Sequence, residues 1–377
     1  MNERKKLHSL FKRLDYVTLI LVVIISVIGL VVIASASKSA DGISRRFLVQ
    51  SVAFVIGLGL MIFMSSIDYE SYQDFVKPII LGSILLLLFT LIFGEGKEET
   101  GSNSWIRFGP IGIQPSELVK IAFAITFSVH LVKVKEDINV LRTLCGLFGH
   151  FLLIVLPVIL QNDTGTALVF TFMFLVMLFC AGLSYKYIFA GVGAIAVFAP
   201  IAWFFLLQPY QKNRFLTFFN PESDPLGHGY QVTQSKIAIG SGEFLGRGYL
   251  KGPQTQLSML PEKETDFIFG VIGEEFGFIG TTIVLLLLIF LICRCLYISS
   301  QAKNDLGKFM CIGISAMLLF HTFENICMCV GLMPVTGIPL PFLSYGGSSL
   351  ITNFAAIGLV MSVWARRHTI NFGLEPI

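Results

Sequence analysis

The sequence predicts an all-α, polytopic membrane protein. Hydrophobic residues make up 54% of its 377 residues and charged residues 14%, and the mean hydropathy is +0.77. These values lie far outside the usual range of soluble globular proteins. Long apolar runs recur from one end of the chain to the other, without the alternating pattern of a membrane β-barrel. We therefore expect residues 1–377 to form a single transmembrane domain.

Ten apolar runs approach the roughly 20 residues that a helix needs to cross a bilayer. In chain order they cover residues 16–36, 48–65, 77–94, 117–133, 143–160, 165–183, 187–207, 267–293, 308–331 and 345–365. The first run lacks a cleavage site of small residues, so we expect it to be retained as a span. The fourth follows Pro115, a residue favoured in the first turn of a helix. Most neighbouring spans are joined by short loops, and the two long intervals lie before the fourth and before the eighth run.

The distribution of Lys and Arg predicts which side each loop occupies, because short cytoplasmic loops are enriched in these residues. With the N-terminus inside, the cytoplasmic segments receive Arg4, Lys5, Lys6, Lys12, Arg13, Lys133, Lys135, Arg142, Lys186, Arg294, Lys303, Lys308, Arg366 and Arg367. Arg45 and Arg46 are exceptions, since this orientation places them outside. An even number of spans puts both termini in the cytoplasm.

Three segments concentrate polar residues on the opposite, outer side. They are residues 95–116, the large loop 208–266, and residues 333–349, which combine three prolines with a Gly-Gly pair. A loop as long as the second is usually functional or disordered, and its spread of aromatic and charged residues argues against disorder. Irregular backbone close to the membrane is tolerated where it lines a cavity walled by protein. We expect the functional site on this side.

Asp266 ends the large loop, directly before the eighth span. One interpretation is that Asp266 or Thr265 caps the following helix. A compatible one is that the carboxylate is the general base for the hydroxyl of an amphiphilic substrate, a role worth a factor of roughly 10² to 10⁴. Glu274 and Glu275 lie inside the same span and are expected to face the bundle interior. They would either pair with Lys or Arg of another helix or brace a cavity beneath Asp266.

Other ionisable residues also stand out within or between the spans. Glu117 and Lys120 are spaced i, i+3, which favours an ion pair. Asp163, in a short outer turn, suits an Asx turn or a helix cap. His321 and Glu324 share one helix face, which fits either a polar contact between helices or a path for protons or ions.

Several classes of protein are not supported by the sequence. No cluster of His, Cys and acidic residues has the spacing of a zinc site, and no nucleotide-binding or hydrolase motif is found. The net charge of +3 is accounted for by the topology, so we expect no nucleic-acid partner.

Four separated stretches resemble motifs of the SEDS family (shape, elongation, division and sporulation). They are WIRFGPIGIQPSELVKIA (105–122), QNDTGTAL (161–168), LPEKETDFIFGVIGEEFG (260–277) and GIPLPFLSYGGSS (337–349). They follow the family's order, and the resemblance covers essentially the whole chain. Within the family, QSKIAIGSG (234–242) and PQTQL (253–257) are most similar to the rod-elongation branch. The division and sporulation branches share the other motifs.

The resemblance implies a peptidoglycan glycosyltransferase, a hexosyltransferase of the bacterial cytoplasmic (inner) membrane. Family members polymerise lipid II, an undecaprenyl-pyrophosphate-linked sugar, at the outer face of that membrane, for cell-wall elongation and cell shape. Asp266 matches the family's loop aspartate, the expected base. Glu117 and Lys120 match its paired charges, and Asp163 matches the acid of its second motif. The same motifs contain four further candidates for substrate binding or structural support: Trp105, Arg107, Lys263 and Ser344.

The resemblance also implies a cofactor and partners. A divalent cation, Mg²⁺ or Mn²⁺, would assist the pyrophosphate, because metal ions stabilise charge on leaving oxygens. A class B penicillin-binding protein would supply the transpeptidase, beside other membrane proteins of the elongation complex. Six basic residues of the large loop are candidates for a phosphate-binding wall: Lys212, Arg214, Lys236, Arg247, Lys251 and Lys263.

Two departures from the family pattern affect these assignments. Asn162 and Thr164 replace the usual Pro and Leu of the second motif. Ser104 stands where the family often has a basic residue, and Arg107 is the candidate substitute.

Two other classes of function also fit the sequence. A lipid II flippase would depend on charge spread across the membrane more than on one loop acid. A scaffold that only recruits a transpeptidase would tolerate Asp266→Asn without loss.

Overall fold

The computed structural model describes residues 14–37, 44–96, 102–108, 111–206, 209–225 and 227–367. Within these ranges the regular secondary structure consists of helices and one two-stranded sheet. The basic residues predicted to precede the first span, Arg4, Lys5, Lys6, Lys12 and Arg13, lie outside the described residues.

Each of the ten predicted spans coincides with a helix. These helices are α2 (Tyr16–Ala36), α3 (Arg45–Ser66), α4 (Val76–Phe93), α6 (Pro115–Val134), α7 (Leu141–Leu160), α8 (Thr164–Cys180), α9 (Tyr185–Ile201), α13 (Ile268–Ser300), α14 (Asp305–Cys329) and α15 (Gly347–Ala365). By length and composition, 7 of the described helices can cross a membrane, and α6, α8 and α9 are not among them. Both α8 and α9 have only 17 residues, and α6 begins with the charges of Glu117 and Lys120. The chain is therefore a multi-pass membrane protein, while the count of ten spans stays a prediction.

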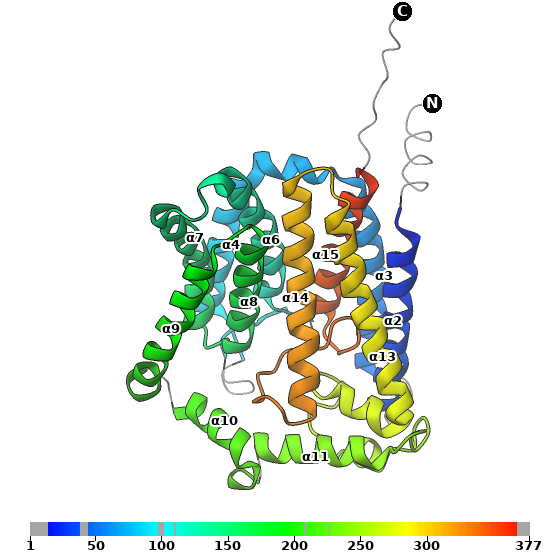
Figure 1. The fold of residues 1–377 in the computed structure, drawn as a ribbon. Coiled ribbons are helices and arrows are strands. Elements are labelled where there is room, and N and C mark those ends of the chain that lie inside the picture. Colours follow the sequence, from blue (N-terminus) through cyan, green and yellow to red (C-terminus); the bar gives the residue numbers. More distant parts are fainter. Residues whose placement is uncertain are drawn as a thin grey trace, which may run out of the picture.

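Shorter elements connect these helices. They are η1 (Tyr69–Phe75), η2 (Lys135–Asp137), the π-helical η3 (Ala202–Leu206), α10 (Pro209–Phe219), η4 (Pro221–Ser223), α11 (His228–Ser241) and α12 (Pro253–Gln256). The sheet pairs β1 (Ile106–Phe108) antiparallel with β2 (Ile111–Ile113). Helices α10 and α11 lie across one end of the bundle (Figure 1), so most of the large loop is folded into helices and turns.

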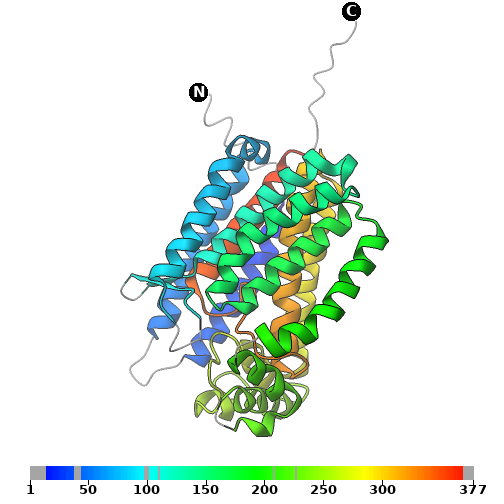
Figure 2. The same ribbon diagram turned by 90° about the vertical axis from the view of Figure 1, so that its left-hand side faces the viewer.

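Helix α14 lies inside the bundle, against α13, α8 and α6, and α15 packs along α3 (Figures 1 and 2). Most of α14 and α15 is buried, whereas only a small part of α3 and α4 is. A glycine allows the close approach of α3 to α15, because a Cβ on Gly57 would lie 2.5 Å from the ring of Phe354. Helix α9 diverges from its neighbours toward the end that carries α10 (Figure 1). Apolar helices that are exposed on the outside of a bundle are expected to face lipid.

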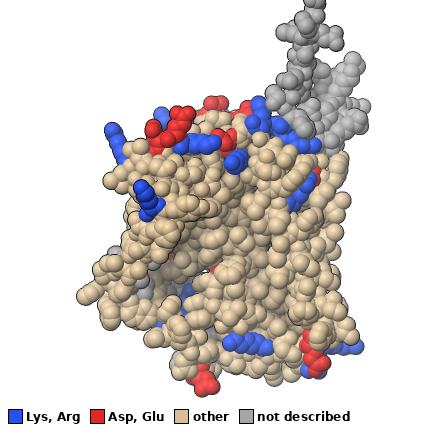
Figure 3. All heavy atoms as spheres, in the orientation of Figure 1, with Lys and Arg blue, Asp and Glu red and all other residues tan. Residues whose placement is uncertain are grey.

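The two ends of the bundle carry different parts of the chain. Helix α2 begins and α15 ends at one end, called here the terminus-bearing end, and the large loop covers the other, the loop end (Figures 1 and 2). Charged side chains on the visible face gather mainly at these two ends (Figure 3). Four ion pairs tie loops and helices together at the terminus-bearing end: Asp15–Arg294 at 2.8 Å, Lys135–Asp305 at 2.6 Å, Lys303–Glu70 at 3.3 Å and Arg366–Asp68 at 3.4 Å.

Helix α13 is interrupted at Gly277, whose φ of 65° and ψ of −161° are not helical. The large loop supplies partners for the backbone groups that the interruption frees. Arg247 donates its N–H to the carbonyl of Glu274 at 2.8 Å, and Phe278 donates its N–H to the carbonyl of Glu243 at 2.8 Å. The first turns of α13 and the large loop therefore form one hydrogen-bonded unit, which positions the residues just before α13.

Candidate active site at the loop end

Asp266 lies at the loop end, in the turn between the large loop and α13. The cap residue of α13 is Phe267, which makes no side-chain hydrogen bond, so the predicted capping role of Asp266 or Thr265 is wrong. The main chain at Asp266 is held instead by Asn325 of α14. The amide of Asn325 donates to the carbonyl oxygens of Asp266 and Ile338, at 2.8 Å each. The backbone of Asp266 is thus anchored while its side chain takes no part in a cap.

The Asp266 carboxylate is half-buried and has no hydrogen-bond or ion-pair partner among the residues that the structure describes. Its pKa is raised from the ordinary 3.8 to about 7, first by burial and then by the negative charge of Glu262, while the positive charge of Arg214 opposes the rise. Gly337 faces this carboxylate, and a Cβ built there would lie 3.4 Å from Oδ2. A carboxylate whose pKa lies near the working pH can accept a proton during a reaction.

The segment between α14 and α15, residues 330–346, has no regular secondary structure and is called here the irregular segment. It covers the turn that contains Asp266. Ser344 is buried in it and donates its hydroxyl to the carbonyl of Thr265 at 2.6 Å. Tyr345 donates its N–H to the carbonyl of Glu264 at 2.7 Å. Gln50 of α3 holds the segment from the other side, donating to the carbonyl of Ser344 at 3.0 Å. Ser344 therefore supports the site, and Gln50 is a supporting residue that no sequence motif indicated.

Arg46 has a partner at the loop end. The predicted orientation placed this residue outside, although Lys and Arg were expected mainly on the cytoplasmic side. Its guanidinium lies 2.6 Å from the carboxylate of the buried Glu264. The same guanidinium lies 6.0 Å from the ring centre of Tyr345. This contact joins the start of α3 to the turn before Asp266, which gives a structural reason for a basic residue on this side.

A buried polar cluster joins α6, α14 and the irregular segment. Lys120 lies 2.7 Å from Glu117, which confirms the predicted ion pair, and 2.7 Å from Nε2 of His321. An ammonium group can only donate, so Nε2 of His321 accepts and its Nδ1 donates to the carbonyl of Pro339 at 3.2 Å. This confirms the predicted polar contact between helices for His321.

Glu324, one turn further along α14, is fully buried and accepts a hydrogen bond from Thr336 of the irregular segment. Its other carboxylate oxygen is buried without a hydrogen-bond partner in the described part of the chain. The backbone of Thr336 also gives a reason for the glycine at position 165, in the motif QNDTGTAL. A Cβ on Gly165 would lie only 3.0 Å from the Thr336 carbonyl oxygen. The irregular segment can therefore pass close to the start of α8.

Asp163 caps α8, as one of its two predicted roles required. Its carboxylate accepts hydrogen bonds from the N–H of Thr166 at 3.1 Å and from the side chain of Gln114 at 2.8 Å. Burial raises the pKa of Asp163, and its hydrogen bonds and the positive charge of Lys120 oppose that rise. The ends of α6 and α8 that lie at the loop end thus form one polar cluster with the Glu117–Lys120 pair.

Three other candidates lie in the segment 95–116 and in the large loop. Trp105 bridges to Glu95 through its backbone, Arg107 lies exposed on β1, and Lys263 donates to the carbonyl of Thr255 at 2.5 Å. Trp105 and Lys263 thus order their own loops. A role of these three residues in substrate binding stays a prediction.

Glu274 and Glu275 were predicted either to pair with Lys or Arg or to act as a brace. The pairing is wrong, because both side chains accept hydrogen bonds from uncharged groups. Glu274 accepts the N–H groups of Gln254 at 2.7 Å and Thr255 at 2.9 Å. Glu275 accepts the hydroxyl of Ser35 at 2.5 Å. The two carboxylates therefore brace the short helix α12 and the end of α2 against α13.

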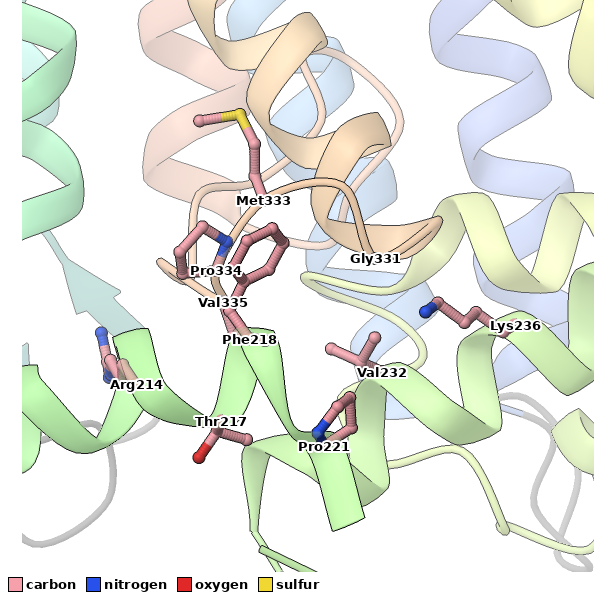
Figure 4. Close-up of a pocket in the computed structure, with 10 residues that line it drawn as sticks. All are labelled: Arg214, Thr217, Phe218, Pro221, Val232, Lys236, Gly331, Met333, Pro334 and Val335. Atoms are coloured by element: carbon pink, nitrogen blue, oxygen red, sulfur yellow. The ribbon is translucent and has the colours of Figure 1, made fainter. Parts of the chain in front are cut away.

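A small cavity opens between α10, α11 and the segment that follows α14 (Figure 4). Two of the six predicted phosphate-binding residues line it, Arg214 from α10 and Lys236 from α11. Gly331, with φ +75°, makes room for the lysine, because a Cβ there would lie 2.5 Å from Nζ of Lys236. The charge of Arg214 also acts on Asp266. The structure thus singles out two basic residues where the sequence offered six.

Comparison with known proteins shows what this arrangement resembles. The model of a family described as "Cell cycle protein", which groups FtsW, RodA and SpoVE, matches residues 15–369. The chain is 38% identical to the peptidoglycan glycosyltransferase MrdB of Escherichia coli K12, over 95% of each protein. It is 36% identical to a probable peptidoglycan glycosyltransferase FtsW of Geobacter metallireducens, over 94% of this chain and 96% of that protein.

A solved structure shows the same fold. One chain of a peptidoglycan synthase complex, studied for the coordination of polymerization and crosslinking, superposes with a TM-score of 0.80 and 30% identity. The match covers 94% of this chain and 98% of that one. The chain therefore belongs to the FtsW/RodA/SpoVE family, which is the SEDS family that its motifs resemble.

Proposed function

We propose that this member of the FtsW/RodA/SpoVE family polymerises lipid II into glycan strands, with Asp266 as the general base. The chain is a peptidoglycan glycosyltransferase, the class in which its relatives are named. One observation carries the assignment of the base. Asp266 combines a firmly held backbone with a half-buried carboxylate that lacks a partner in the described part of the chain and has a pKa of about 7.

The proposed reaction is a displacement at the anomeric carbon of the donor sugar. An acceptor hydroxyl forms the new C–O bond as its proton passes to the Asp266 carboxylate. The bond between the anomeric carbon and the lipid diphosphate breaks, and the diphosphate leaves with its electron pair. A general base must lie within hydrogen-bond reach of the proton that it takes, and a carboxylate without a competing partner can make that contact.

Arg214 and Lys236 are the proposed contacts for the departing diphosphate. Both line the cavity between α10, α11 and the segment that follows α14, and the charge of Arg214 acts on Asp266. Guanidinium and ammonium groups stabilise phosphate oxygens through charge-assisted hydrogen bonds. Charge placed in advance where negative charge develops is a large contributor to catalysis. The diphosphate would then leave from the side of Asp266 that faces α10.

A divalent cation, Mg²⁺ or Mn²⁺, fits these residues only together with the substrate. No group of three or more His, Cys, Asp or Glu side chains in the described ranges could hold a metal ion by itself. Magnesium is commonly held by one or two carboxylates together with substrate phosphates. Glu262, exposed beside Asp266, would hold such a cation jointly with the diphosphate. The cation would supply stabilisation of negative charge on the leaving group.

The proposed orientation places the loop end outside the cytoplasmic membrane and both termini inside. It is supported by the basic residues at the terminus-bearing end, such as Lys135, Arg294 and Arg366, because cytoplasmic loops are enriched in Lys and Arg. Asp266 would then meet a substrate whose sugars lie outside and whose tail lies in lipid.

The proposed partner is a class B penicillin-binding protein, with other membrane proteins of the elongation complex around it. Its support is the peptidoglycan synthase complex, which coordinates polymerization with crosslinking and contains a chain of this fold. We assign the protein to cell-wall elongation because of its QSKIAIGSG and PQTQL stretches. Relatives named RodA and FtsW have similar identities to this chain, 35% and 36%.

The decisive experiment measures glycan polymer formed from labelled lipid II by the protein with its transpeptidase partner. We expect Asp266→Asn to lower the rate by a factor of roughly 10² to 10⁴. Its melting temperature should not fall, because no described residue pairs with the carboxylate. Glu222→Gln, a change at an exposed acid of the same loop, is the matched control and should keep full activity.

Equal polymer from wild type and Asp266→Asn would remove Asp266 from the chemistry. No polymer from a folded wild type with a competent partner and substrate would instead favour a flippase or a scaffold. Translocation of lipid II by this protein alone, measured in vesicles, would then separate those two functions.

A further inference from the structure

A groove separate from the cavity at Arg214 and Lys236 lies between α4, α6 and α7. It has a volume of about 590 Å³ and is open to the outside of the bundle. Helix α6 contributes Thr126, His130 and Lys133 to its lining. These residues are spaced i, i+4 and i+7 along the last turns of α6, so they form one stripe on the helix. Lys133 is the closest of the three to the terminus-bearing end.

The floor of the groove is formed by glycines of α7. A Cβ built on Gly146 or on Gly149 meets nothing within 4 Å, so any side chain there would project into the groove. Val76 and Ile80 of α4 and Leu153 of α7 add apolar walls. The groove thus combines apolar walls and floor with one polar stripe.

His150 of α7 joins two residues of the polar stripe by hydrogen bonds. Nε2 of His150 lies 3.2 Å from the hydroxyl of Thr126, and its Nδ1 lies 3.2 Å from Nδ1 of His130. One ring must donate and the other accept across the Nδ1 contact. If Thr126 donates to His150 and His150 to His130, then Nε2–H of His130 remains as a donor for a ligand. In the described part of the chain, no residue pairs with that nitrogen or with the exposed ammonium of Lys133.

We propose that this groove binds an anionic phospholipid of the leaflet at the terminus-bearing end, which the proposed orientation identifies as the cytoplasmic leaflet. The phosphate lies at Lys133, a glycerol or ester oxygen accepts from His130, and an acyl chain lies over Gly146 and Gly149. Polarity along the groove falls from a full positive charge through an imidazole to apolar walls, the order in which a phospholipid changes from phosphate to ester to hydrocarbon. Basic pockets between transmembrane helices on the cytoplasmic side bind anionic head groups for the same electrostatic reason.

Native mass spectrometry of the purified protein tests this, with equimolar phosphatidylglycerol and phosphatidylcholine added in detergent. Wild type should retain phosphatidylglycerol preferentially. Lys133→Ala should weaken that retention about fivefold, the factor that corresponds to about 1 kcal/mol for one lysine near the membrane surface. Gly149→Leu should block the retention of lipid in the groove, and the empty space around Gly149 allows the variant to fold.

Two matched variants control for charge and for bulk. Lys186→Ala removes an exposed basic residue at the start of α9, and Gly59→Leu adds bulk at an open position of α3. Both should retain phosphatidylglycerol as wild type does, and melting temperatures would verify that all four variants are folded. The proposal is overturned if Lys133→Ala and Gly149→Leu both retain the lipid normally. It is also overturned if only Lys133→Ala has an effect, because the phosphate would then bind at the surface without the groove.

Discussion

The two ends of the bundle use their carboxylates differently. At the terminus-bearing end, four acids are each paired with Arg or Lys: Asp15, Asp68, Glu70 and Asp305. The loop end also has two ion pairs, Glu117–Lys120 and Arg46–Glu264, and neither includes Asp266. Asp266 itself has no partner within the described ranges, and its pKa is raised to about 7. A paired acid contributes to stability, whereas an unpaired and partly buried acid costs stability and is available for chemistry.

The largest expected effect on stability comes from the buried pair at the terminus-bearing end. Asp15 is buried and its carboxylate is bound by two nitrogens of Arg294, at 3.0 and 2.8 Å. Removing one partner of a buried pair leaves the other charge uncompensated, so Asp15→Asn should destabilise the protein by about 3 kcal/mol. Denaturation in detergent measures this loss. The polymerisation rate per folded molecule should stay at the wild-type value. A lower rate with unchanged stability would contradict the idea that acids at the terminus-bearing end stabilise the fold and take no part in the reaction.

A smaller and mixed effect is expected at Asn325, which is structural but lies directly behind Asp266. Asn325→Ala leaves the carbonyl groups of Asp266 and Ile338 without their donor, which should cost roughly 1–3 kcal/mol of stability. Because the same change frees the backbone of Asp266, kcat should fall more than KM rises. Asn353→Ala is the control, since Asn353 is buried but its side chain has a single, long hydrogen bond of 3.4 Å within the described ranges. Equal effects of the two variants on kcat would show that Asn325 does not position the base.

The pH profile separates Asp266 from the paired acids. Its pKa of about 7 lies above the ordinary 3.8, so the rate should fall as pH drops below about 7, approaching tenfold per pH unit. The sign for stability is opposite. A raised pKa in the folded protein means that the stability contribution of Asp266 is complete below pH 3.8 and is lost as pH rises through about 7. Above pH 7, Asp266→Asn should therefore be at least as stable as wild type.

Two neighbouring charges allow the midpoint of that profile to be moved in both directions. Glu262→Gln removes the negative charge that raises the pKa of Asp266, so the midpoint should move to lower pH. Arg214→Gln removes the opposing positive charge, so the midpoint should move to higher pH. Rates measured across pH with both variants provide the test. Shifts in the same direction would mean that another group controls the profile.

The smallest effects are expected from pairs whose basic partner is about half exposed, whichever end they occupy. The side chain of Arg46 is 52% exposed in its pair with Glu264, and that of Lys135 is 44% exposed in its pair with Asp305. Exposed ion pairs contribute about 0–1 kcal/mol, so Arg46→Gln and Lys135→Gln should each cost no more than about 1 kcal/mol of stability. Denaturation at low and high salt measures both. A much larger loss for Arg46→Gln would show that Glu264 cannot be left buried without its partner.

The sequence by itself determined the helical framework of this protein. Apolar runs predicted every helix of the bundle, because a bilayer requires each spanning segment to satisfy its own backbone hydrogen bonds. Local spacing also predicted the Glu117–Lys120 pair, because its residues are three positions apart along one helix. The short turn at Asp163 predicted either an Asx turn or a cap, and the cap is present. The four motifs identified the family, and Asp266 could be named as the candidate base from them.

Only the tertiary structure decided which charged residues are already engaged. The sequence suggested that Asp266 caps α13. In the structure its carbonyl oxygen accepts a hydrogen bond from Asn325, 59 positions away, and its carboxylate does not cap the helix. Glu274 accepts hydrogen bonds from backbone N–H groups about twenty positions earlier. Partners at such separations leave no local pattern, because they depend on how helices pack and on where a long loop folds back. The pKa of Asp266 has the same origin, since burial and the approach of Arg214 arise only when the large loop closes over the end of the bundle.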